Sequence, residues 1–461
     1  MPLADLATPP AAVADAADLI DRIDNAFAGG FARLSEDHLA ALDALGRTFA
    51  RTPLAKPLAE ALDGIRRSEF IDRHFLVLAA ARAALQGAQH DALAAQAAAA
   101  LGRPAARPEA LPAGKGQAPP PQIDVWLESA RHWLMELALA GFSNLEVATL
   151  VPFQATLDQI EGEPRLGRHA ALLGGFLEEL LTVFPARGTP QIPLFRWADL
   201  WSRAMVLSAR APSPVAARSV TGELRLVGAD LRQHETFATL VAFGSLREAG
   251  KPPRLVRATV SAFKVDVIQG EEIGPLLADC ASTLLDALAG QKALAIADMP
   301  LMATGDLIWN DKAAKAGAGF DMLGEAAALL KDGPEARPCL DAADRHPALI
   351  EELVHFSSYQ LGSKKDTLAI TVDGAAVAVE QERWPSSDDL GPTDLKDGSM
   401  MTGLLRFDAG RWTVQPLVLG LPKKKPSFIG SSFGGSKGRK SKLGALATLK
   451  ERSGKLLRKK S

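Results

Sequence analysis

The spacing of apolar residues changes from a helical period to a strand period at Pro212 and Pro214. Before these prolines, apolar residues recur every three or four positions, as in residues 123–137, which is the spacing of an amphipathic helix. After them the period is two, as in residues 254–262, which is the spacing of a half-buried strand. Strands and helices do not alternate regularly beyond this point. We therefore predict an α+β fold, with a helical N-terminal half and a mostly antiparallel sheet with helices in the C-terminal half.

A proline-rich segment divides the helical half into two parts. Residues 102–122 contain six prolines in 21 residues and no sustained apolar period, which is typical of a linker. We predict an alanine-rich helical domain over residues 1–101 and a helical layer over residues 123–211. An α+β domain over residues 212–420 and a disordered basic tail over residues 421–461 complete the chain.

The β-rich part opens with three strands and a helix. The third strand is expected over residues 254–268, and its apolar face changes phase by one residue near Phe263, which indicates a bulge or a bend. A helix over residues 272–289 follows. Cys280 falls on its apolar face, so we expect a small buried side chain there, and a single pair of cysteines excludes a disulfide framework.

Two further helices and two hairpins are expected downstream. Residues 322–331 and 347–356 have helical apolar spacing. Asp373-Gly374 lies between two β-branched runs and predicts a tight hairpin turn, and residues 408–410 predict a second one.

Charge is distributed very unevenly. Residues 421–461 hold 13 of the 52 Lys and Arg residues but only one of the 54 acidic residues, so the tail carries about +12 and the remainder about −14. We predict that the tail binds a partner. Its basic residues are Lys423, Lys424, Lys425, Lys437, Arg439, Lys440, Lys442, Lys450, Arg452, Lys455, Arg458, Lys459 and Lys460.

The composition of the tail does not identify its partner. A specific protein, nucleic acid phosphates and an anionic membrane surface would each attract it, and so would the acidic body of the chain itself. Leucines recur at near-helical spacing among the last twenty residues, although Gly444 and Gly454 weaken a helix there.

The best candidate for chemistry in the body is the loop over residues 297–311. Asp298, Asp306 and Asp311 lie near Trp309, and three carboxylates can hold Mg²⁺ or Ca²⁺ or serve a hydrolase. The same residues are good turn formers, and a partner contact is the third alternative. Because the turn explanation needs nothing further, we assign no metal and no cofactor.

Other motifs lack the context that their chemistry requires. Residues 430–434 match the G-x-S-x-G pattern, but they lie in a Ser/Gly/Lys tail and not between a buried strand and a helix. His234 lacks the second histidine of a zinc-protease helix. No catalytic residue is assigned. The first residues have no basic region of a signal peptide, and no apolar run of about 18 residues predicts a membrane span, so we expect a cytoplasmic protein.

Residues 294–311, with the strand and helix over residues 263–277, resemble uncharacterised bacterial proteins encoded beside a MoxR-type AAA+ ATPase, a von Willebrand factor A protein and a SWIM zinc-finger protein. The resemblance covers residues 219–311. Zinc-finger cysteines, Walker motifs and the Asp-x-Ser-x-Ser metal site are missing from the sequence, so the chain would be a further member of such a neighbourhood. The resemblance implies a non-enzymatic accessory or adaptor role, in a multiprotein system linked to an AAA+ ATPase. The residues themselves leave two alternatives: a nucleic-acid-associated protein that binds through the basic tail, and a hydrolase that uses the carboxylates of residues 297–311.

Overall fold

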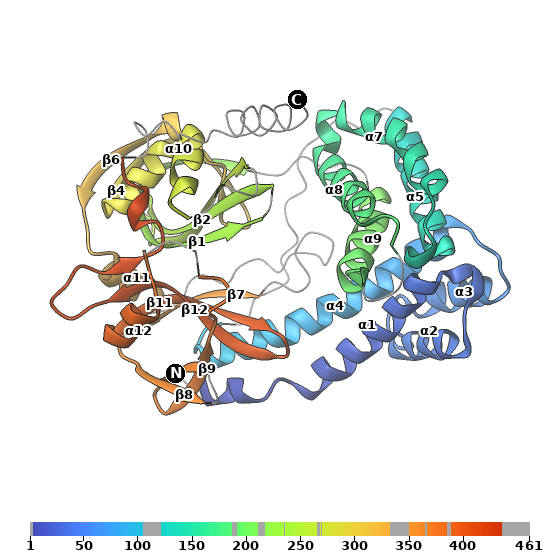
Figure 1. Cartoon of the computed structure of the whole chain (residues 1–461), viewed down its shortest axis with the longest axis horizontal. Helices are drawn as coiled ribbons and strands as arrows, with labels where there is room; N and C mark the ends of the chain where they lie inside the picture. Colours follow the sequence, from blue (N-terminus) through green and yellow to red (C-terminus); the bar gives the residue numbers. More distant parts are fainter. Residues whose placement is uncertain are drawn as a thin grey trace, which may run out of the picture.

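The computed structural model describes residues 3–104, 121–186, 191–210, 217–234, 236–264, 268, 270–331, 350–364, 367–384 and 389–435. These residues form a lobe of helices followed by a lobe of two β-sheets (Figure 1). All but two of the strand pairings in the second lobe are antiparallel among the described residues. The predicted α+β fold, with helices first and sheets second, is therefore confirmed.

The helical lobe buries one continuous apolar core. Phe27 packs against Trp201 with ring centroids 4.5 Å apart, so the segments on either side of the proline-rich linker share this core. The two helical segments that were predicted separately therefore fold around the same side chains. The helices are α1 (Ala11–Gly29), α2 (Glu36–Thr48), α3 (Ala55–Arg66), α4 (Asp72–Ala100), α5 (Pro121–Ala140), α6 (Val147–Leu150), α7 (Gln154–Glu161), α8 (Gly167–Val183) and α9 (Leu194–Ser208).

Two glycines allow the ends of α1 and α5 to touch. Gly30 and Gly141 have φ angles of 92° and 82°, in the region that favours glycine. A Cβ atom on Gly141 would lie 2.4 Å from the backbone nitrogen of Gly30, so neither position has room for a side chain.

Helix α4 joins the two lobes. Its 29 residues extend about 43 Å, and Figure 1 shows the helix running from one lobe to the other. Phe75 near its start lies in the helical core, whereas Leu93 and Ala97 lie in the core of the β-rich lobe. Beside them, Trp412 Nε1 donates to Gln96 Oε1 at 3.0 Å. The lobes are thus connected by a packed helix.

The first sheet, sheet A, closes on itself. Strand β1 (Ala217–Gln233) pairs with both β2 (Phe237–Arg247) and β4 (Lys292–Met302), and β3 (Arg254–Phe263) and β5 (Asp306–Leu307) complete the ring. Strand β6 (Ala314–Gly319) adds to the outer edge of β4. The predicted long strand ends at Phe263, whose side chain is 85% exposed, and residues 265–267 lie outside the described part of the chain.

Helix α10 (Ile273–Ala289) covers sheet A, as the sequence predicted, but it is kinked at Ala281. Cys280 is exposed instead of buried, so the expectation for this residue was wrong. The buried position that follows Leu277 and Ala278 on this helix is Ala281, and Cys280 lies beside it in the sequence.

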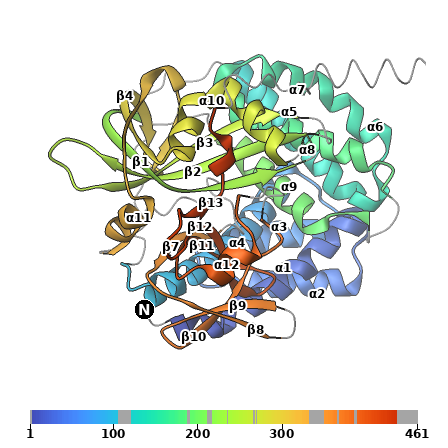
Figure 2. The ribbon, with the colours of Figure 1, turned by 60° about the vertical axis from the view of Figure 1, so that its left-hand side comes forward.

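The second sheet, sheet B, lies beside α4 and has the order β7-β11-β12-β10-β9-β8 (Figure 2). Both predicted hairpins are confirmed, one between β9 (Thr367–Val372) and β10 (Ala375–Val379), the other between β11 (Met400–Asp408) and β12 (Arg411–Gly420). The other strands are β7 (Glu351–Phe356), β8 (Gln360–Lys364) and β13 (Ser427–Phe428), and the helices beside them are α11 (Met322–Lys331) and α12 (Pro392–Asp397).

Residues 351–356 were predicted as a helix and form strand β7 instead. The segment pairs with β11 along its length, from Arg406 opposite Glu351 to Met401 opposite Phe356. A short apolar run is compatible with a helix or with a strand. Here the pairing with the antiparallel strand β11 makes the segment a strand. Among the described residues, no helix combines the length and the apolar character that crossing a membrane requires.

Candidate functional site

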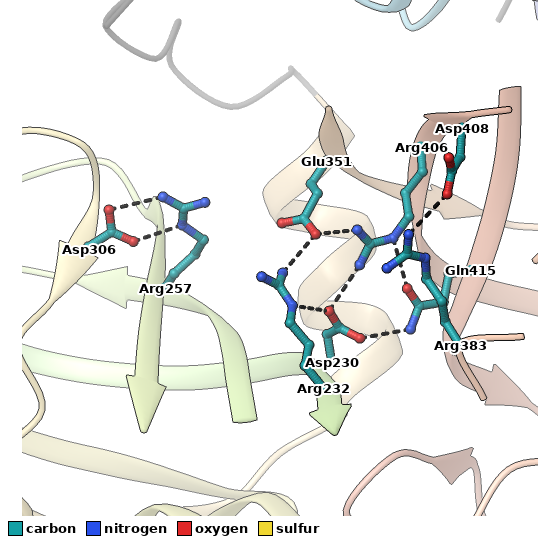
Figure 3. Close-up of polar contacts among 9 residues, drawn as sticks. All are labelled: Asp230, Arg232, Arg257, Asp306, Glu351, Arg383, Arg406, Asp408 and Gln415. Atoms are coloured by element: carbon teal, nitrogen blue, oxygen red, sulfur yellow. Dashed lines mark hydrogen bonds and ion pairs between the residues drawn. The ribbon is translucent and has the colours of Figure 1, made fainter. Parts of the chain in front are cut away.

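The predicted loop over residues 297–311 separates into independent structural contacts. Asp306 forms two parallel hydrogen bonds with Arg257, each 2.9 Å long, and so fastens β5 to β3 (Figure 3). Asp298 has a φ angle of 50° on β4 and accepts a hydrogen bond from Ser219 Oγ at 3.3 Å. Asp306 and Asp298 therefore bind different neighbouring residues.

Asp311 stabilises the kink of α10. It accepts hydrogen bonds from the backbone nitrogen and hydroxyl of Thr283, from Ser282 Oγ and from Trp309 Nε1. Burial acts to raise the pKa of Asp311, but these hydrogen bonds outweigh it and hold the pKa below its ordinary value. The carboxylate thus replaces the backbone partners that Thr283 loses at the kink.

The structure does not bring Asp298, Asp306 and Asp311 together as ligands of one ion. Within the described ranges, no group of three or more His, Cys, Asp or Glu side chains is arranged to hold a metal. Trp309 is half-buried beside Asp311 and belongs to the same capping contact.

A buried ionic network between the two sheets was not predicted. Asp230 of β1 lies opposite Arg406 of β11, and both side chains are 3% exposed. Arg406 Nη2 donates to Asp230 Oδ2 at 2.9 Å and Arg406 Nη1 donates to Glu351 of β7 (Figure 3). Gln415 Nε2 donates to Asp230 Oδ1 at 2.8 Å, and Arg232 contacts both carboxylates at 2.7–2.8 Å.

Strand geometry explains how the network assembles. Asp230 and Arg232 are two residues apart on β1 and so point to the same side, and Glu351 pairs directly with Arg406 across β7 and β11. Two carboxylates face two guanidinium groups, so the network has no net charge. Burial acts to raise the pKa of Asp230, but Arg406 and Arg232 more than offset it and lower the pKa. The network fastens sheet A to sheet B.

The basic tail begins from a fixed root. We define the tail root as residues 427–435, which the sequence assigned to the disordered tail. Strand β13 pairs with β12, and Phe428, Ile429 and Phe433 are buried. The folded body therefore extends beyond residue 420, because these apolar side chains complete the core of the β-rich lobe.

One carboxylate, Asp389, holds the tail root. It accepts hydrogen bonds from Ser431 Oγ at 2.6 Å, from Ser432 N at 2.9 Å and from Gly430 N at 3.2 Å. Ser432 Oγ also donates to it at 3.1 Å. The serines of the G-x-S-x-G pattern are thus engaged in holding the chain. Gly435 N donates to Asp286 Oδ1 of α10 at 2.8 Å, which fixes the last described residue.

The predicted partner-binding residues are divided by this root. Lys423, Lys424 and Lys425 precede it, and Lys424 lies 3.7 Å from Asp397 in an exposed ion pair. The others lie outside the described residues; they are Lys437, Arg439, Lys440, Lys442, Lys450, Arg452, Lys455, Arg458, Lys459 and Lys460.

No family model, no curated protein and no solved structure matches the chain.

Proposed function

We propose that this chain is a non-enzymatic adaptor of a bacterial multiprotein system in the cytoplasm, and that it docks onto an acidic partner through residues 436–461. The observation that carries the proposal is the tail root. Four hydrogen bonds to Asp389 and the burial of Phe433 fix the backbone that directly precedes the basic segment in the sequence. The segment is therefore tethered to the body at a fixed point.

The charge of the segment favours an anionic partner. Residues 436–461 contain ten Lys and Arg residues and one Glu. Such a concentration of one sign accelerates encounter with a surface of the opposite sign and makes binding weaken with salt. The resemblance to proteins encoded beside a MoxR-type ATPase makes an AAA+ ATPase the first partner to test.

The test is purification of the tagged full-length protein from its host, compared with a variant truncated after Gly435. We expect tail-dependent recovery of a protein partner. Truncation at this residue keeps Phe428 and Phe433, whereas truncation after Gly420 would remove them from the core. Equal thermal stability of the full-length and truncated proteins is the control for folding.

Two further variants sharpen the result. Replacing the ten basic residues of 436–461 by Gln should abolish recovery, since it removes charge and keeps length. Asp389→Asn should weaken it, because the tail root loses its charged acceptor. Recovery of the same partner by the truncated protein would contradict the proposal.

A nucleic-acid-associated protein is the alternative outcome of the same experiment. In that case recovery is lost after nuclease treatment, and the binding constant falls steeply with salt. If Asp306→Ala removed a biological activity while the fold persisted, the carboxylate-dependent hydrolase would be favoured instead.

A further inference from the structure

The outer face of the helical lobe carries an open groove, which we call the α5 groove. It lies between α5 and the segment formed by α6, η4 (Val151–Phe153) and α7, and its volume is about 370 Å³. Trp133 and Phe153 lie at its floor, 5% and 3% exposed, and their rings stack with centroids 4.0 Å apart and an interplanar angle of 3°. Trp133 Nε1 donates to Thr149 O at 2.9 Å, so the floor is held rigidly.

Apolar side chains around the α5 groove are exposed to solvent. Val125, which lines it, is 53% exposed, and Val147 and Val151 on the neighbouring α6–η4 segment are 55% and 53% exposed. Most large apolar side chains of the described residues are buried, so exposed valines on α5 and on the α6–η4 segment, the two segments that border the groove, form an uncommon surface.

The rim of the α5 groove is acidic. Glu128, His132 and Glu136 follow one another at four-residue spacing along the exposed face of α5, and all three line the groove. The surrounding segment, residues 121–183, contains nine acidic and three basic residues. An apolar floor with carboxylates on its edge fits a basic segment that also carries apolar side chains.

The tail of this chain has that chemistry. Besides its ten basic residues, residues 436–461 contain five leucines: Leu443, Leu446, Leu449, Leu456 and Leu457. The 26 residues reach roughly 90 Å when extended, whereas a compact chain of this size is roughly 60 Å across. The tail is therefore long enough to cross the molecule from Gly435.

We propose that the α5 groove binds residues 436–461 of the same molecule. The leucines cover the Trp133–Phe153 floor and the basic side chains face Glu128 and Glu136. This contact masks the tail until an acidic partner competes for it, a role that rests on the proposed adaptor function. The groove would then regulate partner binding by occupying the docking segment.

The experiment uses the protein truncated after Gly435 and a fluorescent peptide of residues 436–461. Every described residue of the two hydrophobic cores precedes Gly435, so the truncation removes none of them. Fluorescence anisotropy should show saturable binding to the body. Glu128→Lys with Glu136→Lys should weaken binding at least about tenfold, because two rim charges are reversed. Asp15→Lys with Asp18→Lys, on the exposed face of α1, is the matched control and should leave binding unchanged.

The full-length protein tests occupancy of the groove by its own tail. As a monomer in sedimentation, it should bind the peptide at least about tenfold more weakly than the truncated body does, because its groove is already filled. A peptide with Ser in place of Leu443, Leu446 and Leu449 should bind poorly. Two results would overturn the proposal. One is equal affinity of the full-length and truncated proteins for the peptide. The other is equal affinity of the Glu128/Glu136 and Asp15/Asp18 variants for the peptide.

These results are separable from those of the adaptor test. If the peptide does not bind the groove but the tail still recovers a partner, only the masking contact fails. If the peptide binds the groove and no tail-dependent partner is recovered, the adaptor function fails alone. When both hold, Glu128→Lys with Glu136→Lys in the full-length protein should increase partner recovery.

Discussion

Replacement of Arg406 by methionine tests whether the ionic network fastens the two sheets. Methionine fills much of the same volume but carries no charge. Asp230 and Glu351, which are 3% and 4% exposed in their side chains, would lose this guanidinium and keep the contact with Arg232, whose side chain is 38% exposed. Breaking a buried ion pair by removing one partner costs about 3–5 kcal/mol. We therefore expect the free energy of unfolding to fall by about 4 kcal/mol.

Arg383 provides the matched control in the same lobe. It contacts Asp408 at 3.0 Å, but the two side chains are 43% and 55% exposed (Figure 3). Exposed pairs contribute about 0–1 kcal/mol, so Arg383→Met should change stability little. Urea denaturation, followed by tryptophan fluorescence and by circular dichroism, measures both variants. An Arg406→Met protein within 1 kcal/mol of the wild type would refute the reasoning.

The network also predicts a pH dependence. Because the folded pKa of Asp230 lies below its ordinary value of 3.8, its contribution is present above that value and is lost as pH falls through the folded pKa. Without Arg406, burial of Asp230 is opposed only by Arg232 and Gln415. The stability difference between wild type and Arg406→Met should therefore be largest at neutral pH and shrink below about pH 4.

Two other substitutions test the helical lobe. Burial outweighs the Arg82 guanidinium and raises the pKa of Asp24 from 3.8 to about 6, so the folded protein loses about 2 kcal/mol of stability as pH rises from 4 to 7. The side chain of the Asp24→Asn variant does not titrate. Urea denaturation between pH 4 and 7 should therefore show the free energy of unfolding of the wild type falling by that amount relative to the variant. A difference between the two proteins that stays constant over this pH range would count against burial as the cause. Gly141→Ala should lower the free energy of unfolding by more than about 2 kcal/mol, since its Cβ would lie 2.4 Å from Gly30 N, whereas Gly102→Ala, in open space at φ 65°, should cost about 1 kcal/mol. Equal melting temperatures for the two alanine variants would contradict the close approach.

Local sequence signals determined many of the elements. Asp373 and Gly374 have φ angles of 49° and 83°, as the tight turn between β9 and β10 requires, and neighbouring residues suffice to predict such a turn. The apolar spacing of residues 322–331 likewise predicted α11. These predictions succeeded because backbone preference and apolar period act over a few residues.

Short segments whose state depends on a distant partner could not be assigned in this way. Strand β7 becomes extended through its pairing with β11, and the kink of α10 is stabilised by Asp311, which lies 28 residues from its partner Thr283 along the chain. The tail root was assigned to the tail because the lysines, serines and glycines of residues 421–461 dominate the composition on both sides of it. Its fold depends on Asp389, which is 41 to 43 residues away along the chain.

The sequence by itself determined that a helical half precedes a strand-rich half, and that charge is separated between body and tail. Only the tertiary structure decided which charged groups meet. Asp230 and Arg406 are 176 residues apart, and nothing near either residue in the sequence indicates the other. The physical reason is that burying either charge alone is costly, so the packing of sheet A on sheet B is favourable only where the two are brought together.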